Sequence, residues 1–128
     1  MITPSLLPHQ PANEYWFAEG CFILELSNSP ADPALSIARA RVLPGGQTRW
    51  HLLHAISERY VIQSGSGCVE VGELAPQSVA AGDVVIIPPG CRQRIRNTGS
   101  DDLIFLALCT PRFAASAYED LEGSTTSG

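Results

Sequence analysis

Short runs of β-prone residues recur along the whole chain, and turns rich in glycine and proline separate them. The runs follow one another roughly every eight to twelve residues, with turns such as Pro44-Gly45-Gly46 and Pro88-Pro89-Gly90 between them. Strands are expected over 14–18, 21–26, 36–42, 47–52, 58–63, 68–71, 77–79, 83–87, 92–97 and 103–109. This spacing predicts an all-β protein, built as a sandwich or a barrel.

One segment near the C-terminus departs from the strand pattern. Residues 114–121 have helical periodicity, and we expect one short C-terminal helix there. The 128 residues correspond to a single domain, residues 1–128. Its barrel core is expected over about 14–110, with an N-terminal extension over 1–12 and a C-terminal segment over 111–128 that ends in a frayed tail.

Charge and composition exclude several kinds of partner. The net charge of −5 argues against a nucleic-acid surface, which needs a basic field. No apolar run approaches the roughly 18 residues of a membrane span, and the N-terminus lacks a secretory signal, so we expect a cytoplasmic protein without a membrane partner. The four cysteines form no CxxC pair, which favours free thiols, most of them buried.

Alternation along two strands predicts which side chains face the interior. The three arginines of 92–97 share one face, while Gln93 and Ile95 share the other. Three unpaired guanidiniums inside a small barrel would be too costly, so Gln93 and Ile95 are expected to point inward. Glu58 and Tyr60 likewise share a face, and an inward Glu58 requires a partner.

The chain contains two ordered motifs. Gly45 is followed after five residues by His51, then by Glu58, and after six more residues by Gly65. Sixteen residues later the second motif begins, with its members at Gly82, Pro88, Gly90, Gln93 and Asn97.

Together the motifs resemble those of the cupin family, G-x5-H-x-H-x3-4-E-x6-G followed by G-x5-P-x-G-x2-H-x3-N. The resemblance covers residues 45–97 and implies an antiparallel double-stranded β-helix, the jelly-roll or cupin barrel. The chain is similar to the small single-domain cupins of the conserved-barrel type.

The chain departs from the family pattern at two ligand positions. Gln93 stands where the second motif has a histidine, and Leu53 stands where the first motif has its second histidine. His54 follows one residue later, so it either enters the interior through a bulge or remains a surface histidine. A subset of cupins with an H-x-L-x4-E-R-Y pattern and a T-P-R-F…Y segment is similar to this chain, which has Thr110-Pro111-Arg112-Phe113 and Tyr118.

The resemblance implies one divalent metal ion, Mn, Fe, Ni, Co or Zn. Its ligands would be His51, Glu58 and Gln93, with His54 as a further candidate. The alternative is a metal-free interior in which Gln93 hydrogen-bonds with Glu58 and His51.

Four residues are candidates for contact with a substrate. Tyr60 and Ile95 would line the interior, although Tyr60 is favoured as a packing residue. Arg39 and Arg41 would either bind an anionic group at the barrel mouth or face solvent.

Two functions follow from the resemblance. The first is a metal-dependent enzyme of the dioxygenase, isomerase or decarboxylase type, acting on a small polar organic molecule; the second is a non-catalytic ligand-binding or sensor protein. The sequence offers no clear inward acid or base besides the expected ligands, which favours binding or O2 chemistry over proton transfer. A homodimer is also expected, with Tyr15-Trp16-Phe17 as a candidate contact.

Overall fold

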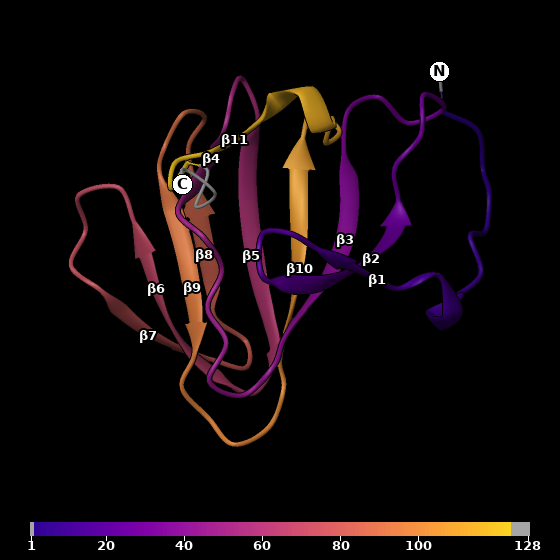
Figure 1. The fold of residues 1–128 in the computed structure, drawn as a ribbon. Coiled ribbons are helices and arrows are strands. Elements are labelled where there is room, and N and C mark those ends of the chain that lie inside the picture. Colours follow the sequence, from indigo (N-terminus) through magenta and orange to yellow (C-terminus); the bar gives the residue numbers. More distant parts are fainter. Residues whose placement is uncertain (1, 124–128) are drawn as a thin grey trace.

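Two antiparallel β-sheets make up the fold, which was obtained as a computed structural model describing residues 2–123 (Figure 1). The first sheet has the strand order β1 (Tyr15–Phe17), β2 (Cys21–Ser27), β3 (Ser36–Val42), β10 (Leu103–Thr110), β5 (Ser57–Ser64) and β8 (Val84–Ile87). The second has the order β11 (Tyr118–Asp120), β4 (His51–Leu53), β9 (Gln93–Asn97), β6 (Ser66–Val71) and β7 (Gln77–Ala80). Two single 3-10 turns, η1 (Pro11–Asn13) and η2 (Ala115–Ala117), accompany the strands.

The ten strands expected from the sequence are all present. The strand expected over 47–52 differs most, because regular pairing is confined to β4 and Gln47 forms only an isolated bridge to Arg96. The all-β prediction is therefore confirmed.

The prediction of a C-terminal helix over 114–121 is wrong. Only η2 is helical there, and the chain continues directly into β11, which pairs with β4 through Tyr118 opposite Leu53 and Asp120 opposite His51. A segment this short gains little from an isolated helix, whereas the free edge of β4 offers it backbone partners. The backbone N–H of Leu121 donates to the carbonyl of Trp50 at 2.9 Å, which continues the pairing.

The faces predicted by alternation are confirmed. Glu58, Tyr60 and Ile62 of β5 are buried, as are Gln93 and Ile95 of β9. The arginines of β9 face outward, where Arg94 bonds to Glu70 at 3.1 Å.

The main apolar core lies between the two sheets. Five different strands contribute large and fully buried members, among them Val42, Ile62, Ile87, Ile95, Leu103 and Phe105. All four cysteines are free thiols, and Cys21 and Cys109 are buried. No helix within 2–123 has the length and apolarity needed to cross a membrane.

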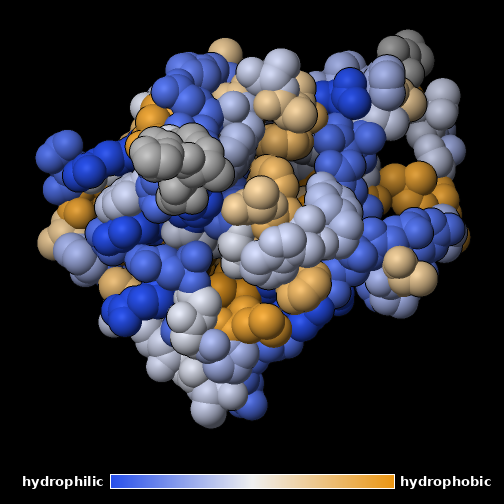
Figure 2. All heavy atoms as spheres, viewed as in Figure 1, coloured by the Kyte–Doolittle hydropathy of each residue, from blue (hydrophilic) through white to orange (hydrophobic). Residues whose placement is uncertain are grey.

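The surface view of the same face shows apolar side chains gathered over the region of β5 and β10, flanked by hydrophilic ones (Figure 2). The N-terminal residues 2–13 are exposed and run beside the end of the first sheet that holds β1 and β2 (Figure 1).

Candidate functional site

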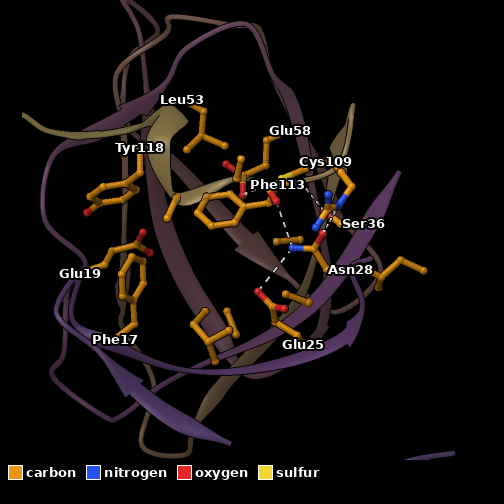
Figure 3. A pocket seen from close by; sticks show the side chains of 18 of the residues that line it. Phe17, Glu19, Glu25, Asn28, Ser36, Leu53, Glu58, Cys109, Phe113 and Tyr118 are labelled. Carbon is orange, nitrogen blue, oxygen red and sulfur yellow. Dashed lines mark hydrogen bonds between the residues drawn. The ribbon is translucent and has the colours of Figure 1, made fainter. Parts of the chain in front are cut away.

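A cavity of about 480 Å³ opens among β2, β3, β4, β5, β10 and the C-terminal segment. Most of its wall is apolar, and the aromatic and aliphatic members include Phe17, Ile23, Ala38, Ala40, Leu53, Phe105, Phe113 and Tyr118. Its polar members include Glu19, His51, Glu58, Tyr60 and Cys109. Figure 3 shows Glu19 and Tyr118 on one side of this pocket and Asn28 and Ser36 on the other. An apolar pocket with a few converging polar groups is the usual form of a small-molecule site.

Glu58 is held by a chain of buried hydrogen bonds. The amide nitrogen Nε2 of Gln93 donates to Glu58 Oε1 at 2.9 Å, and the Tyr60 hydroxyl donates to the amide oxygen of Gln93. Gln93 is only 1% exposed, and it lies behind the two side chains that reach the cavity. The second oxygen of Glu58 lies 3.9 Å from the Cys109 thiol.

His51 faces a second carboxyl group. Its Nδ1 lies 2.7 Å from the backbone carbonyl of Arg49, which makes Nδ1 the protonated nitrogen and leaves the Nε2 lone pair free. Nε2 lies 3.3 Å from Glu19 Oε1, and the Tyr118 ring stacks on the imidazole with centroids 5.2 Å apart.

Glu19 owes its position to the turn between β1 and β2. The next residue, Gly20, has a φ of +112°, and a Cβ there would lie 2.8 Å from the carbonyl oxygen of Gln47. Only glycine fits this close approach. The turn directs the Glu19 side chain inward, where the Cys21 thiol donates to Oε2 at 3.5 Å.

Burial shifts the pKa values of all three ionisable groups. Desolvation raises the pKa of Glu19 to about 8, helped by the nearby charge of Glu58, and desolvation raises the pKa of Glu58 to about 7. Burial lowers the pKa of His51. Near neutral pH, a neutral His51 therefore faces a protonated Glu19, while Glu58 can gain or release a proton.

The structure brings four of the expected site residues together, and the four others lie elsewhere. His51, Glu58, Gln93 and Tyr60 form the polar part of the site. His54 lies on the outer face, where its side chain is 60% exposed and its Nε2 lies 2.6 Å from Glu119.

Neither Arg39 nor Arg41 contacts the cavity. Both guanidiniums bond to Glu14 on the outer face of β3, and Arg41 also bonds to Asp102 at 3.0 Å. Ile95 is fully buried in the main core and does not line the cavity.

The donor atoms do not fit the metal site that the motifs imply. The Gln93 amide is engaged by Glu58 and Tyr60 and does not line the cavity, and Leu53 contributes no donor at all. Within residues 2–123, no three side chains of His, Cys, Asp or Glu converge closely enough to hold a metal ion. The hydrogen bonds among Tyr60, Gln93 and Glu58 satisfy these groups without one.

Two parts of the site, the Glu19 carboxyl group and the aromatic wall, were not predicted from the sequence. Glu19 lies in a turn, outside both motifs, so neither strand alternation nor spacing points to it. Phe17, Phe113 and Tyr118 also lie outside the motifs, although Phe113 and Tyr118 belong to the T-P-R-F…Y segment.

Comparison with known proteins agrees with the strand order and the motifs. The sequence matches the cupin domain family over residues 38–109, which is more than half of the chain. The chain belongs to this family. No curated protein sequence matches it.

Several solved structures are similar. An oxalate decarboxylase from Lactobacillus farciminis, in a formate complex, has a TM-score of 0.71 and 25% identity, covering 84% of this chain and 33% of its own. A predicted oxalate decarboxylase from Thermotoga maritima has a TM-score of 0.65 and 29% identity, covering 71% and 80%. KdgF from Halomonas has a TM-score of 0.74 but 16% identity, covering 85% and 96%, and shares the fold. The chain thus spans about a third of the Lactobacillus protein.

Proposed function

We propose that this cupin is a metal-independent enzyme that transfers a proton at a carbon next to a carbonyl group of a small organic molecule. The observation that carries the proposal is the pair of buried carboxyl groups, Glu19 and Glu58, that face one largely apolar cavity beside His51. Glu19 is the inward acid that the sequence did not reveal. Its presence favours the isomerase type of chemistry over simple binding.

The two carboxyl groups suit opposite roles. Glu58, whose pKa is about 7, takes the proton from carbon as the base, because Gln93 holds only its Oε1 and leaves Oε2 toward the cavity. Glu19, protonated at neutral pH, gives its proton to the carbonyl oxygen, and the product is an enol. For a substrate with a hydroxyl on the carbon that loses its proton, this enol is an enediol. Glu58 then delivers its proton to the former carbonyl carbon, and the hydroxyl on the other carbon returns a proton to Glu19 and becomes the new carbonyl, which completes an isomerisation. His51 Nε2 lies 3.3 Å from Glu19 Oε1 and orients that carboxyl group.

Oxalate is a poor candidate for this site, despite the similarity to oxalate decarboxylases. A small dianion beside Glu19 and Glu58 would meet two carboxyl groups, because the arginine that lines the same cavity, Arg112, is bound to Asn28 on the other side. A cavity of about 480 Å³ also leaves most of its volume unfilled by so small a molecule.

Deuterium exchange tests the proposal directly. The protein is incubated in D2O with a panel of small ketones and aldehydes, and deuterium at the carbon next to the carbonyl is followed by NMR. Glu58→Gln and Glu19→Gln should each slow the exchange by about 100-fold. Glu73→Gln, which changes an exposed glutamate, should leave the rate unchanged.

The divalent metal expected from the motifs defines the contrary outcome. Elemental analysis is made on protein purified without chelators or added metal, and repeated on Glu58→Ala. About one equivalent of Mn, Fe, Ni, Co or Zn in the wild type, lost in the variant, would overturn metal independence. Exchange that is absent in the wild type, or equal in all variants, would overturn the proton-transfer role.

A further inference from the structure

The T-P-R-F segment places an arginine at the same cavity. Arg112 lies two residues beyond β10, lines the pocket and donates from its Nε to Asn28 Oδ1 at 2.8 Å. Asn28 lies on the side of the pocket opposite Glu19 (Figure 3). Among the lining residues that the structure describes, Arg112 is the only one with a permanent positive charge.

The backbone around Arg112 is fixed without help from its charged end. The N–H of Arg112 donates to the carbonyl of Pro33 at 3.1 Å, and the N–H of Phe113 donates to Ser36 Oγ at 2.8 Å. The amide of Asn28 donates to the Phe113 carbonyl at 3.0 Å. These bonds hold the segment on both sides of the arginine, so the guanidinium is not needed to position the chain.

The Arg112 guanidinium is held in one orientation, but most of its hydrogen-bond donors are free. Its Nε donates to Asn28 Oδ1 at 2.8 Å, which fixes the plane of the group. Its two terminal nitrogens have no hydrogen-bond or ion-pair partner within residues 2–123. Neither nitrogen is among the buried polar atoms that lack a partner, so both remain accessible. Glu25 also lines the cavity, but it forms no ion pair with Arg112; its Oε1 lies 3.5 Å from Asn28 Nδ2. A planar group with two free N–H pairs is suited to a carboxylate.

We propose that Arg112 binds the carboxylate of a monoanionic substrate whose apolar body lies along the aromatic wall of the cavity. The proposal rests on the proposed function for the site that the substrate occupies, and it adds the class of that substrate. The uncharged end of the molecule then lies at Glu19 and Glu58, where a second negative charge would be repelled. The class is therefore a small monocarboxylic acid with an uncharged polar group remote from its carboxylate.

Binding of two matched probes tests this assignment without turnover. Benzoate and benzamide have the same ring and nearly the same shape, but only benzoate carries a charge. Titrations followed by NMR or calorimetry should show that the wild type binds benzoate about ten-fold more tightly than benzamide. This preference should shrink as salt is raised, because an ion pair at the rim is screened.

Variants distinguish carboxylate binding by Arg112 from a general change in the shape or stability of the pocket. Arg112→Gln should weaken benzoate by about ten-fold and leave benzamide within two-fold, while Arg112→Lys should retain part of the preference. Arg96→Gln makes the same change of charge on the exposed outer face and should change neither affinity. If Arg112→Gln does not fold, Arg112→Lys and the salt dependence of the wild type decide the question.

Three results would overturn the assignment of Arg112 as the carboxylate-binding residue. They are no benzoate binding to the wild type, equal affinity of the wild type for the two probes, or an equal loss of affinity for both probes in Arg112→Gln. Failure of deuterium exchange alone would overturn the proposed reaction and leave the benzoate preference intact. The two proposals can therefore fail separately.

Discussion

Glu58 and Glu19 are unusual residues for the interior of so small a protein. The Glu58 side chain is 8% exposed, and no arginine or lysine neutralises it. Burial therefore favours its protonated form, and the hydrogen bond from Gln93 recovers only part of the lost hydration. Such a group destabilises the fold above its pKa, which is a feature of functional sites more than of structural ones.

This burial predicts how stability depends on pH. Both carboxyl groups bind a proton more tightly in the folded protein than in the unfolded chain, where the pKa is near 4.5. Their contribution is fully present below about pH 4.5 and is lost as pH rises through 7 to 8. Glu58→Gln should thus raise the free energy of unfolding relative to wild type by about 2 to 3 kcal/mol more at pH 8 than at pH 5.

Urea unfolding at the two pH values measures this difference. Glu73→Gln, which changes an exposed glutamate, serves as the control and should show no such change with pH. A Glu58→Gln variant that follows the wild type at every pH would contradict the buried-carboxyl interpretation.

The two neighbouring histidines should behave very differently on substitution. His54→Ala removes an exposed contact with Glu119 and should cost less than about 1 kcal/mol, with benzamide binding unchanged. His51→Ala removes the partner of Glu19 and the ring under Tyr118, and should weaken benzamide binding. Calorimetric titration of both variants checks this, and equal effects would contradict the placement of His54 outside the site.

Alternation along strands predicts side-chain direction where the strand is regular, and it succeeded for Glu58, Tyr60, Gln93 and Ile95. Alternation predicts nothing in a turn, because the backbone there follows no two-residue repeat. Glu19 points inward because Gly20 packs against the backbone at Gln47, a contact between segments far apart in sequence. No local pattern contains that information.

At the scale of elements, the C-terminal segment closes one side of the cavity. It passes through η2 into β11, and β11 pairs only with the three-residue strand β4. Tyr118 connects this short strand to the site by stacking on His51 and meeting Phe17 edge to face, with centroids 5.3 Å apart. Tyr118 makes the aromatic contacts of the segment, and a two-bond ion pair between Arg49 and Asp120, at 3.0 and 3.1 Å, holds its exposed face.

Removing that side chain should loosen the whole strand. Tyr118→Ala should destabilise the protein by about 1 to 2 kcal/mol, since two aromatic contacts are lost, and should speed amide exchange throughout β11. Hydrogen-exchange mass spectrometry resolves this segment from β10. The matched change Glu119→Ala, on the outward face of the same strand, should speed exchange far less; equal effects would show that the aromatic contacts do not hold β11.

The mistaken helix over 114–121 has a related cause. The alanines and the spacing of apolar residues favour a helix locally, but the segment is too short to form one unaided. Pairing with β4 satisfies its backbone instead, and that partner is nearly seventy residues away in the sequence. The ten other strands needed no such information, because their turns define their ends.

At the scale of the whole molecule, exposed apolar side chains bear on assembly. Trp16 is 57% exposed although it packs edge to face with Phe22, whereas Tyr15 and Phe17 both belong to the cavity wall. The predicted homodimer would therefore use Trp16 above all, since the other two residues of the cluster contribute to the site.

Light scattering should give the mass of two chains at micromolar concentration. Trp16→Ser should shift that mass toward one chain, because it removes the largest exposed aromatic group from β1. Leu74→Ser, an equally exposed apolar site on the β6–β7 turn, is the control and should not change the mass. A wild type of monomeric mass would rule out the dimer.

The cavity wall has a consequence for where the domain can be cut. The match to the family ends at residue 109 and begins at residue 38, yet Phe17, Glu19, Arg112, Phe113 and Tyr118 all lie outside those limits. A fragment trimmed to the family boundaries would keep His51 and Glu58 but lose the acid opposite them, the arginine and most of the aromatic wall. Chimeras that exchange only these two flanks between cupins should accordingly exchange ligand preference, while the shared strands between them stay the same.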